Sequence, residues 1–97
     1  MAVTVFVGMK SEPGKGDELS KRLGEMFGDT RERDGCLSIL LVRDQADPDR
    51  FVIVERWAST EDHHAYQAWR QSRGDGSALA GVLAEAPTHD SFDEIEV

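Results

Sequence analysis

The chain has 97 residues, 39% hydrophobic and 31% charged, which is too apolar a composition for a disordered protein. This length predicts one domain over residues 1–97. The net charge of −8, with no compensating Lys/Arg cluster, argues against nucleic acid and anionic membranes as partners. The start of the chain lacks a signal-peptide pattern, and no apolar run reaches the roughly 20 residues that span a bilayer. The single cysteine, Cys36, rules out an internal disulfide and favours a cytoplasmic location.

Hydrophobic patterning predicts a strand, a loop and a helix at the start of the chain. Residues 3–9 are β-branched or aromatic and form the strand, and Pro and Gly residues mark a loop at 11–17. Apolar residues then recur at helical spacing in one stripe. The stripe consists of Leu19, Leu23, Met26, Phe27 and Thr30. Gly35 is suited to the left-handed backbone that follows a helix.

The middle of the chain predicts a hairpin followed by a second helix. Residues 36–42 and 51–57 are strand-like, and the turn-forming residues between them favour antiparallel pairing. Ser59 is a helix N-cap residue, and Asp62 three residues later resembles a capping box. The helix is expected to run to about Gln71, where a Gly-rich stretch breaks it.

The last third predicts a short helix or turn at 78–85 and a weak final strand. A bulge is expected in this strand because Phe92, Ile95 and Val97 do not keep a strict period of two. The order of elements is βαββαβ. The fold class is therefore α+β, with a four-stranded antiparallel sheet and both helices on one face, the ferredoxin-like split arrangement.

The predicted strands carry apolar residues on both faces, unlike an antiparallel sheet with one wet face. In the second strand, Leu37, Ile39 and Leu41 are expected on one face, and Leu40 and Val42 on the other. Two helices cover only one face, so the other would be a large exposed apolar patch. A homodimer packed sheet to sheet is therefore predicted, the alternative being a monomer with a partly apolar face.

Three stretches of the sequence form a recognisable pattern. They are EPGKGDELSKRL (12–23), DGCLSILLVRD (34–44) and DPDRFVIVERWASTEDHHAY (47–66). Their Pro-Gly-Lys, Gly-Cys and Glu-x-Trp motifs resemble the antibiotic biosynthesis monooxygenase family over nearly the whole chain. The resemblance implies a dimeric α+β barrel with a pocket between sheet and helices in each subunit. It also implies oxidation of phenolic polyketides and quinols by dioxygen without metal or flavin, or oxidative haem breakdown.

The haem-degrading members of that family carry an Asn on the first strand, a Trp on the second helix and a His further along. Val7 and Tyr66 stand at the first two positions here, and no histidine lies between His64 and His89. The resemblance therefore argues against haem breakdown.

The adjacent histidines His63 and His64 do not form a metal site together, because neighbouring side chains on a helix point about 100° apart. His89 is the only other histidine and Cys36 the only thiol. The sequence also lacks a Gly-rich phosphate-binding turn after a strand. We therefore expect no flavin, haem or metal cofactor.

Helical spacing turns His63 and Tyr66 into the predicted pocket and leaves His64 with Gln67 and Gln71 on a solvated face. His63 is either a buried, hydrogen-bonded structural residue or a general base, since imidazole titrates near pH 6.5. Tyr66 combines an apolar ring with a hydroxyl that suits a substrate oxygen. The candidate catalytic residues are thus His63 and Tyr66.

Four further residues are candidates for substrate binding. Trp69 either stacks on a flat ring or packs structurally, and Arg70 either stabilises a phenolate or pairs with a carboxylate. Trp57 and Phe6 are expected in the aromatic wall of the pocket. Glu55, beside Trp57, is interpreted as structural.

Such a pocket suits a cofactor-independent monooxygenase acting on a quinol, anthrone or related phenolic aromatic. A deprotonated electron-rich ring can give one electron to dioxygen, so the protein need only bind the ring, exclude water and favour the anion. The alternative is a non-catalytic dimeric module of the same fold that binds a small apolar ligand or serves in a stress response.

Overall fold

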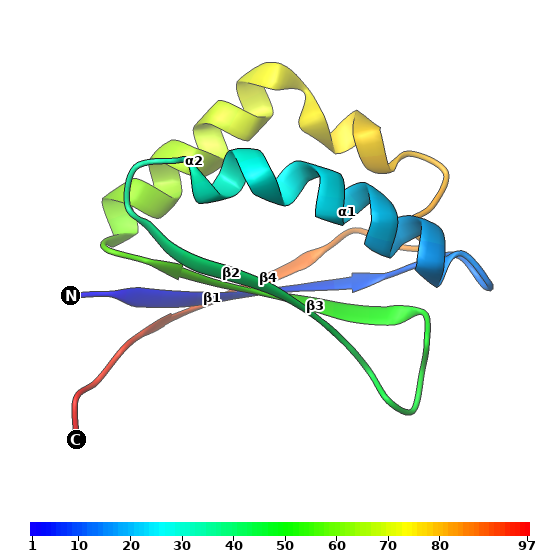
Figure 1. Cartoon of the computed structure of the whole chain (residues 1–97), viewed down its shortest axis with the longest axis horizontal. Coiled ribbons are helices and arrows are strands. Elements are labelled where there is room, and N and C mark those ends of the chain that lie inside the picture. The colour runs from blue at the N-terminus through cyan, green and yellow to red at the C-terminus, as the bar shows by residue number, and fades with distance from the viewer.

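A computed structural model describes residues 1–97 as a four-stranded antiparallel sheet with two helices on one of its faces (Figure 1). The elements are β1 (Val3–Lys10), α1 (Gly16–Arg31), β2 (Cys36–Arg43), β3 (Arg50–Trp57), α2 (Thr60–Arg73), the 3-10 helix η1 (Asp75–Leu79) and β4 (Thr88–Asp93). The strands lie in the order β2-β3-β1-β4. This arrangement confirms the predicted ferredoxin-like βαββαβ fold. Neither α1 nor α2 has the length and apolarity needed to cross a membrane.

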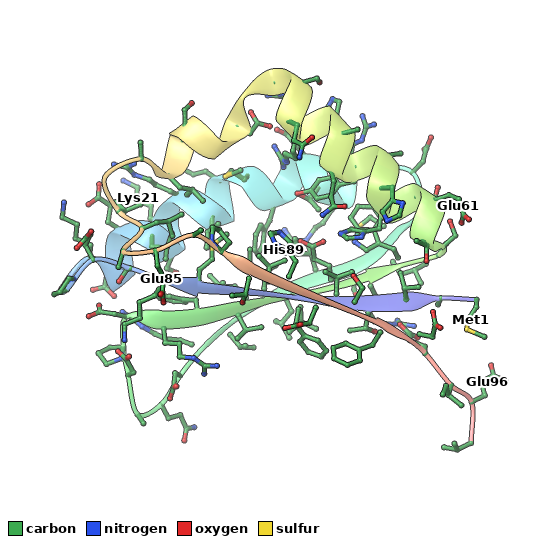
Figure 2. The ribbon with its side chains drawn as sticks, turned by 180° about the vertical axis from the view of Figure 1, so that it is seen from behind. Met1, Lys21, Glu61, Glu85, His89 and Glu96 are labelled. Atoms are coloured by element: carbon green, nitrogen blue, oxygen red, sulfur yellow. The ribbon has the colours of Figure 1, made fainter.

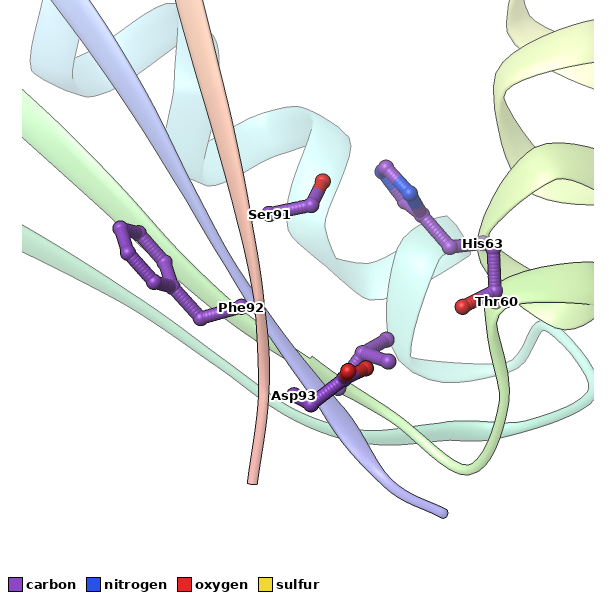
Figure 3. Close-up of a pocket in the computed structure, with 6 residues that line it drawn as sticks. Thr60, His63, Ser91, Phe92 and Asp93 are labelled. Atoms are coloured by element: carbon purple, nitrogen blue, oxygen red, sulfur yellow. The ribbon is translucent and has the colours of Figure 1, made fainter. Parts of the chain in front are cut away.

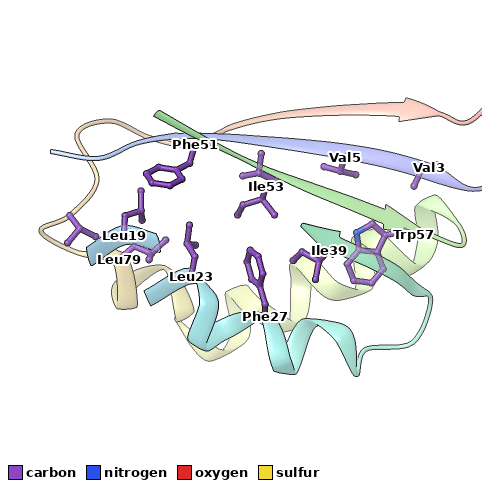
Figure 4. Close-up of a cluster of buried hydrophobic side chains, with 12 residues drawn as sticks. Val3, Val5, Leu19, Leu23, Phe27, Ile39, Phe51, Ile53, Trp57 and Leu79 are labelled. Atoms are coloured by element: carbon purple, nitrogen blue, oxygen red, sulfur yellow. The ribbon is translucent and has the colours of Figure 1, made fainter. Parts of the chain in front are cut away.

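The predicted apolar stripe of α1 is the face that packs on the sheet. Leu19, Leu23, Phe27 and Thr30 are buried, and Met26 is partly buried against the same core. The core also takes alternate residues from β1 and β3 (Figure 4). Its members are Val3, Val5, Val7, Leu19, Leu23, Phe27, Ile39, Phe51, Ile53, Trp57, Leu79 and Val82.

Helix α2 begins where the sequence predicts and ends two residues later than predicted. The Ser59 hydroxyl accepts a hydrogen bond from the Asp62 backbone N–H at 3.1 Å, which confirms the N-cap. The helix continues two residues past Gln71 because the residue that ends it is Gly74, with a left-handed φ of 67°.

The segment 78–85 was predicted as a short helix or a turn, and beyond its first two residues the turn is what forms, over residues 80–82. The short helix η1 begins at Asp75 and ends at Leu79. The following residues run beside the end of β1 instead, with hydrogen bonds from Glu12 N–H to Val82 O and from Ala84 N–H to Lys10 O, both 2.8 Å. Pairing with the backbone of β1 satisfies polar groups that a continued helix would have satisfied internally.

The β-bulge lies in β2 and not in the last strand. β4 pairs with β1 in unbroken register from Thr88 to Asp93, and Ile95 and Val97 fall beyond it, so their irregular spacing does not concern the sheet. The register of β2 shifts between Cys36 and Ser38. This shift leaves Leu37 49% exposed rather than on the buried face with Ile39.

The face of the sheet away from the helices is uncovered and partly apolar. Leu40, Val54 and Phe6 stand opposite one another on three adjacent strands. Phe6 also meets Phe92 edge to face, with ring centroids 5.5 Å apart. The prediction that the sheet is apolar on both faces is confirmed, and we call this uncovered surface the open face.

Replacing Gly35 with alanine is expected to lower the free energy of unfolding by more than about 1 kcal/mol, because its φ of 82° is strained for any residue with a Cβ. An added Cβ would also collide with the Asp62 carboxylate. The matched control is Gly28→Ala on exposed α1 backbone, where no atom lies within 4 Å of the new Cβ. The control is expected to stabilise by about 0.5–1 kcal/mol. Urea denaturation of both variants measures this difference, and equal effects would contradict it.

Candidate active site

A cavity of about 400 Å³ lies between the helices and the sheet. Its volume falls within the usual range for small-molecule sites. Ten of the 19 residues that line it are hydrophobic, and most of these ten belong to β1, β2, β3 and α1. The cavity opens between α2 and β4, where Gln71 and His89 are exposed. In Figure 2, His89 lies on the helix side of β4. The polar lining residues with side chains that can bond a ligand are Thr30, Glu55, Tyr66, Gln67, Arg70, Gln71, Asp75 and His89.

Glu55 is the buried acid of this cavity. It occupies an inward position of β3, between Ile53 and Trp57, and is only 4% exposed. The indole Nε1–H of Trp57 donates a hydrogen bond to Glu55 Oε1 at 3.0 Å. Burial raises the pKa of the Glu55 carboxyl, against the lowering effects of that hydrogen bond and of Arg70. The group is thus suited to take up a proton at a higher pH than an ordinary carboxylate does.

His63 is buried, but it does not line the large cavity. Its Nε2 has no hydrogen-bond partner and lies 3.9 Å from Glu55 Oε1. The ring borders a separate cleft of about 100 Å³ that Thr60 and Ser91 also line (Figure 3). Burial lowers the pKa of His63, with smaller lowering effects from His64 and His89. The structure therefore places His63 behind Glu55 rather than in the cavity.

His64 is exposed, as its position on α2 predicts. Gln71, expected on the same solvated face, is also exposed, whereas Gln67 is half-buried, and both line the large cavity at its opening. The solvated face of α2 is thus narrower than the spacing suggested, because the gap between α2 and β4 brings these amides to the rim.

Tyr66 and Arg70 form a connected polar wall of the cavity. The Arg70 Nε–H donates to the Tyr66 hydroxyl at 3.1 Å, and Tyr66 also bonds Thr30 Oγ1 at 3.0 Å. Arg70 further donates to Asp75 Oδ2 and to Thr30 Oγ1, both at 2.9 Å. The carboxylate pairing considered for Arg70 is therefore present, and it holds the guanidinium against the Tyr66 ring.

The other three candidate residues do not line the large cavity. Trp57 is fully buried, with its ring 4.9 Å from that of Tyr66, so it supports the wall from behind. Trp69 lies half-buried beneath three guanidinium groups, those of Arg33, Arg70 and Arg73, at 4.4 to 4.7 Å. Phe6 is on the open face, on the opposite side of the sheet. Of the six sequence candidates, only Tyr66 and Arg70 line the cavity.

Six of the eight polar cavity residues were not among those candidates, and Glu55 and His89 belong to these six. Glu55 follows the inward alternation of β3, so a charged residue at an apolar position was the signal in the sequence. His89 stands opposite Val7, a buried residue of β1, and that pairing is visible only in the sheet. No three His, Cys, Asp or Glu side chains cluster as a metal ion requires. The polar groups in the lining of the cavity are carboxylate, phenol, hydroxyl, amide, guanidinium and imidazole.

Comparison with known protein families decides the relationship. The model of the antibiotic biosynthesis monooxygenase family matches residues 2–74. The chain belongs to this family. The matched region contains Glu55, His63, Tyr66 and Arg70, and it ends before β4. No curated protein matches the sequence.

Solved structures of several other proteins share the architecture. A Caulobacter crescentus protein superposes with a TM-score of 0.85 at 22% identity, covering 98% of this chain and 91% of that one. A Mycobacterium tuberculosis protein gives 0.84 at 18% identity, covering 100% and 98%. A structure named antibiotic biosynthesis monooxygenase gives 0.80 at 23% identity, covering 97% and 99%. At these identities the similarity establishes the fold.

Proposed function

We propose that this protein is a cofactor-independent monooxygenase that oxidises a quinol, anthrone or related phenolic aromatic with dioxygen. The observation that supports the proposal is the apolar cavity of about 400 Å³ with a buried carboxylate, Glu55, in its wall. A flat apolar ring fits such a cavity, and a carboxylate of raised pKa is a suitable base for a phenolic proton.

The proposed reaction balances without a further reductant. The substrate supplies four electrons, one oxygen atom enters the ring or its methylene carbon as a carbonyl, and the other leaves as water. The reaction begins when the phenolic O–H bond breaks, its proton moves to the base, and the electron pair stays on the substrate oxygen. The resulting anion gives one electron to dioxygen, and the two radicals then combine.

The proposal assigns a role to Glu55 and to the residues that contact it or share the cavity wall with it. Glu55 takes the phenolic proton, and His63 acts through it. Tyr66 and Arg70 lie where they can meet the substrate oxygen, and the positive charge of Arg70 favours its anion. Trp57 supports Glu55 and Tyr66 from behind. Trp69 and Phe6 lie outside the cavity and are not assigned to the ring.

The test is oxygen uptake by the purified, metal-free protein with a panel of quinols and anthrones. Consumption of one dioxygen per product molecule, with one labelled atom from ¹⁸O₂ in the product, is the expected result. Binding of these ligands without oxygen uptake would overturn the proposal.

A non-catalytic ligand-binding role is the second candidate, because the polar side chains of the cavity wall, Tyr66 and Arg70, already form hydrogen bonds within the protein. The Tyr66 hydroxyl has two hydrogen-bond partners, and Arg70 has four. Side chains held by several internal hydrogen bonds can serve to fix the shape of a cavity as well as to take part in catalysis. This role gains support if the aromatic ligands bind and stay unchanged in the presence of dioxygen.

We also propose that the protein is a cytoplasmic, single-domain homodimer that pairs through its open face. Phe6, Leu40, Val42 and Phe92 are 38 to 58% exposed there, which leaves a contiguous apolar surface across the sheet. A second copy would remove this surface from water and release the associated free energy.

Phe6→Glu and Leu40→Glu are each expected to convert the dimer to a monomer, because an unpaired charge would be buried in the interface. Sedimentation velocity at micromolar concentration measures the change. Ala65→Glu, on the exposed side of α2, is the control and is expected to leave the dimer intact. A wild-type protein that sediments only as a single chain would contradict the prediction.

A further inference from the structure

Glu55 and His63 are two buried titratable side chains that face each other across a short gap. Both side chains are about 5% exposed, and His63 Nε2 lies 3.9 Å from Glu55 Oε1. Nε2 is the one buried side-chain polar atom of the protein without a hydrogen-bond partner. A buried polar atom normally has a partner, and an exception calls for a functional explanation.

The two residues border different spaces. Glu55 lines the large cavity, whereas His63 lines the small cleft between α2 and β4 with Ser91 and Asp93 (Figure 3). The cleft has a volume of about 100 Å³, several times the roughly 30 Å³ that one water molecule takes up in the liquid. The pair thus lies between the large cavity and a second space on the same side of the sheet.

We propose that Glu55 and His63 act as one acid–base pair, in which Glu55 takes the phenolic proton and passes it to His63 Nε2. The inference rests on the proposed function. The phenolic O–H bond breaks, an N–H bond forms on His63, and Glu55 returns to the carboxylate. A side-chain movement of about 1 Å brings the 3.9 Å gap to ordinary hydrogen-bond length. Protonated His63 later returns the proton to Glu55, which passes it to the reduced oxygen that leaves as water.

Other charged groups around the pair influence the proton transfer from Glu55 to His63 in opposite senses. Arg70 favours the carboxylate form of Glu55, and His64 and His89 disfavour the protonated form of His63. Cys36 on β2 is also within the field of Glu55, and Asp93 on β4 borders the His63 cleft. Because the neighbouring imidazoles oppose a charge on His63, the proposal assigns the stabilisation of that charge to the ionised Glu55, 3.9 Å from Nε2.

The first experiment follows the titration of the His63 imidazole by NMR in the ligand-free protein. In Glu55→Gln the apparent pKa of His63 is expected to fall by about one unit or more, since an opposite charge at this range is removed. By linkage, His63→Gln raises the pKa of Glu55 by the same amount. His64→Gln, the control, moves the His63 pKa slightly upward. If the pKa of His63 is unchanged in Glu55→Gln and the pKa of Glu55 is unchanged in His63→Gln, the proposal is overturned.

The second experiment separates this inference from the proposed function. His63→Gln is expected to shift the acidic limb of the kcat/KM profile to higher pH, so that activity falls at neutral pH and recovers in alkali. A purely structural His63 would lower activity equally at every pH, which would contradict the relay. If no substrate is oxidised by the wild type, the proposed function fails, and the reciprocal titration still decides whether the pair exists.

Discussion

Replacing Glu55 with glutamine is expected to lower kcat/KM for oxidation of a quinol or anthrone by about 10²–10⁴-fold, the usual contribution of a general base. Glutamine keeps the size of the side chain and removes its ability to take a proton. Because burial raises the pKa of Glu55, wild-type activity is expected to decline as the pH falls through that raised value. The residual activity of Glu55→Gln lacks this acidic limb and rises as the substrate ionises by itself. Oxygen-uptake rates across the pH range measure both effects.

Glu61→Gln provides the control for this substitution. Glu61 lies exposed in the first turn of α2 and makes no side-chain contact with the cavity. Its replacement is expected to leave the rate and its pH profile unchanged. A Glu55→Gln variant as active as Glu61→Gln would show that Glu55 is not the base.

Replacing Trp57 with alanine is expected to lower the free energy of unfolding by about 3–5 kcal/mol, the range for a large aromatic side chain in a core. Trp57 is fully buried and packs against the Tyr66 ring. The substitution also removes the only hydrogen-bond donor to Glu55, which raises the pKa of that carboxyl further. Since whole domains are stable by only about 5–15 kcal/mol, this loss is a large share of the total. Urea denaturation followed by circular dichroism measures it.

Two further variants separate packing from hydrogen bonding. Trp57→Phe keeps most of the apolar volume but leaves the buried carboxylate without its donor, and a loss of about 1–3 kcal/mol is expected. Trp69→Ala removes the other tryptophan, which is half-buried and held by arginine contacts, and a smaller loss than for Trp57→Ala is expected. Equal losses for the two alanine variants would contradict the assignment of Trp57 to the core.

Local patterning was enough to predict the order of the elements. The stripe of α1 and the N-cap at Ser59 are properties of neighbouring residues, and the structure confirms both of them. The position of the bulge was predicted wrongly. A bulge depends on the pairing of two strands, and a single strand does not reveal which of its residues lacks a partner.

The residues of the candidate site were predicted only in part. Helical spacing correctly indicated that His63 is buried and that His64 is exposed, because 100° per residue determines which faces of α2 they occupy. It did not indicate what His63 faces. That depends on Glu55 of β3, on the other side of the gap between helix and sheet.

The sequence by itself determined the family, the βαββαβ order and the apolar character of both sheet faces, since these follow from motifs and from periodicity along the chain. Only the tertiary structure decided which polar groups share the cavity. It placed Tyr66 and Arg70 at the wall and left Trp69 and Phe6 outside it. It also brought in His89 through the pairing of β4 with β1 and set Glu55 against His63. Packing between elements distant in sequence produces these contacts, and no local pattern encodes the distance between them.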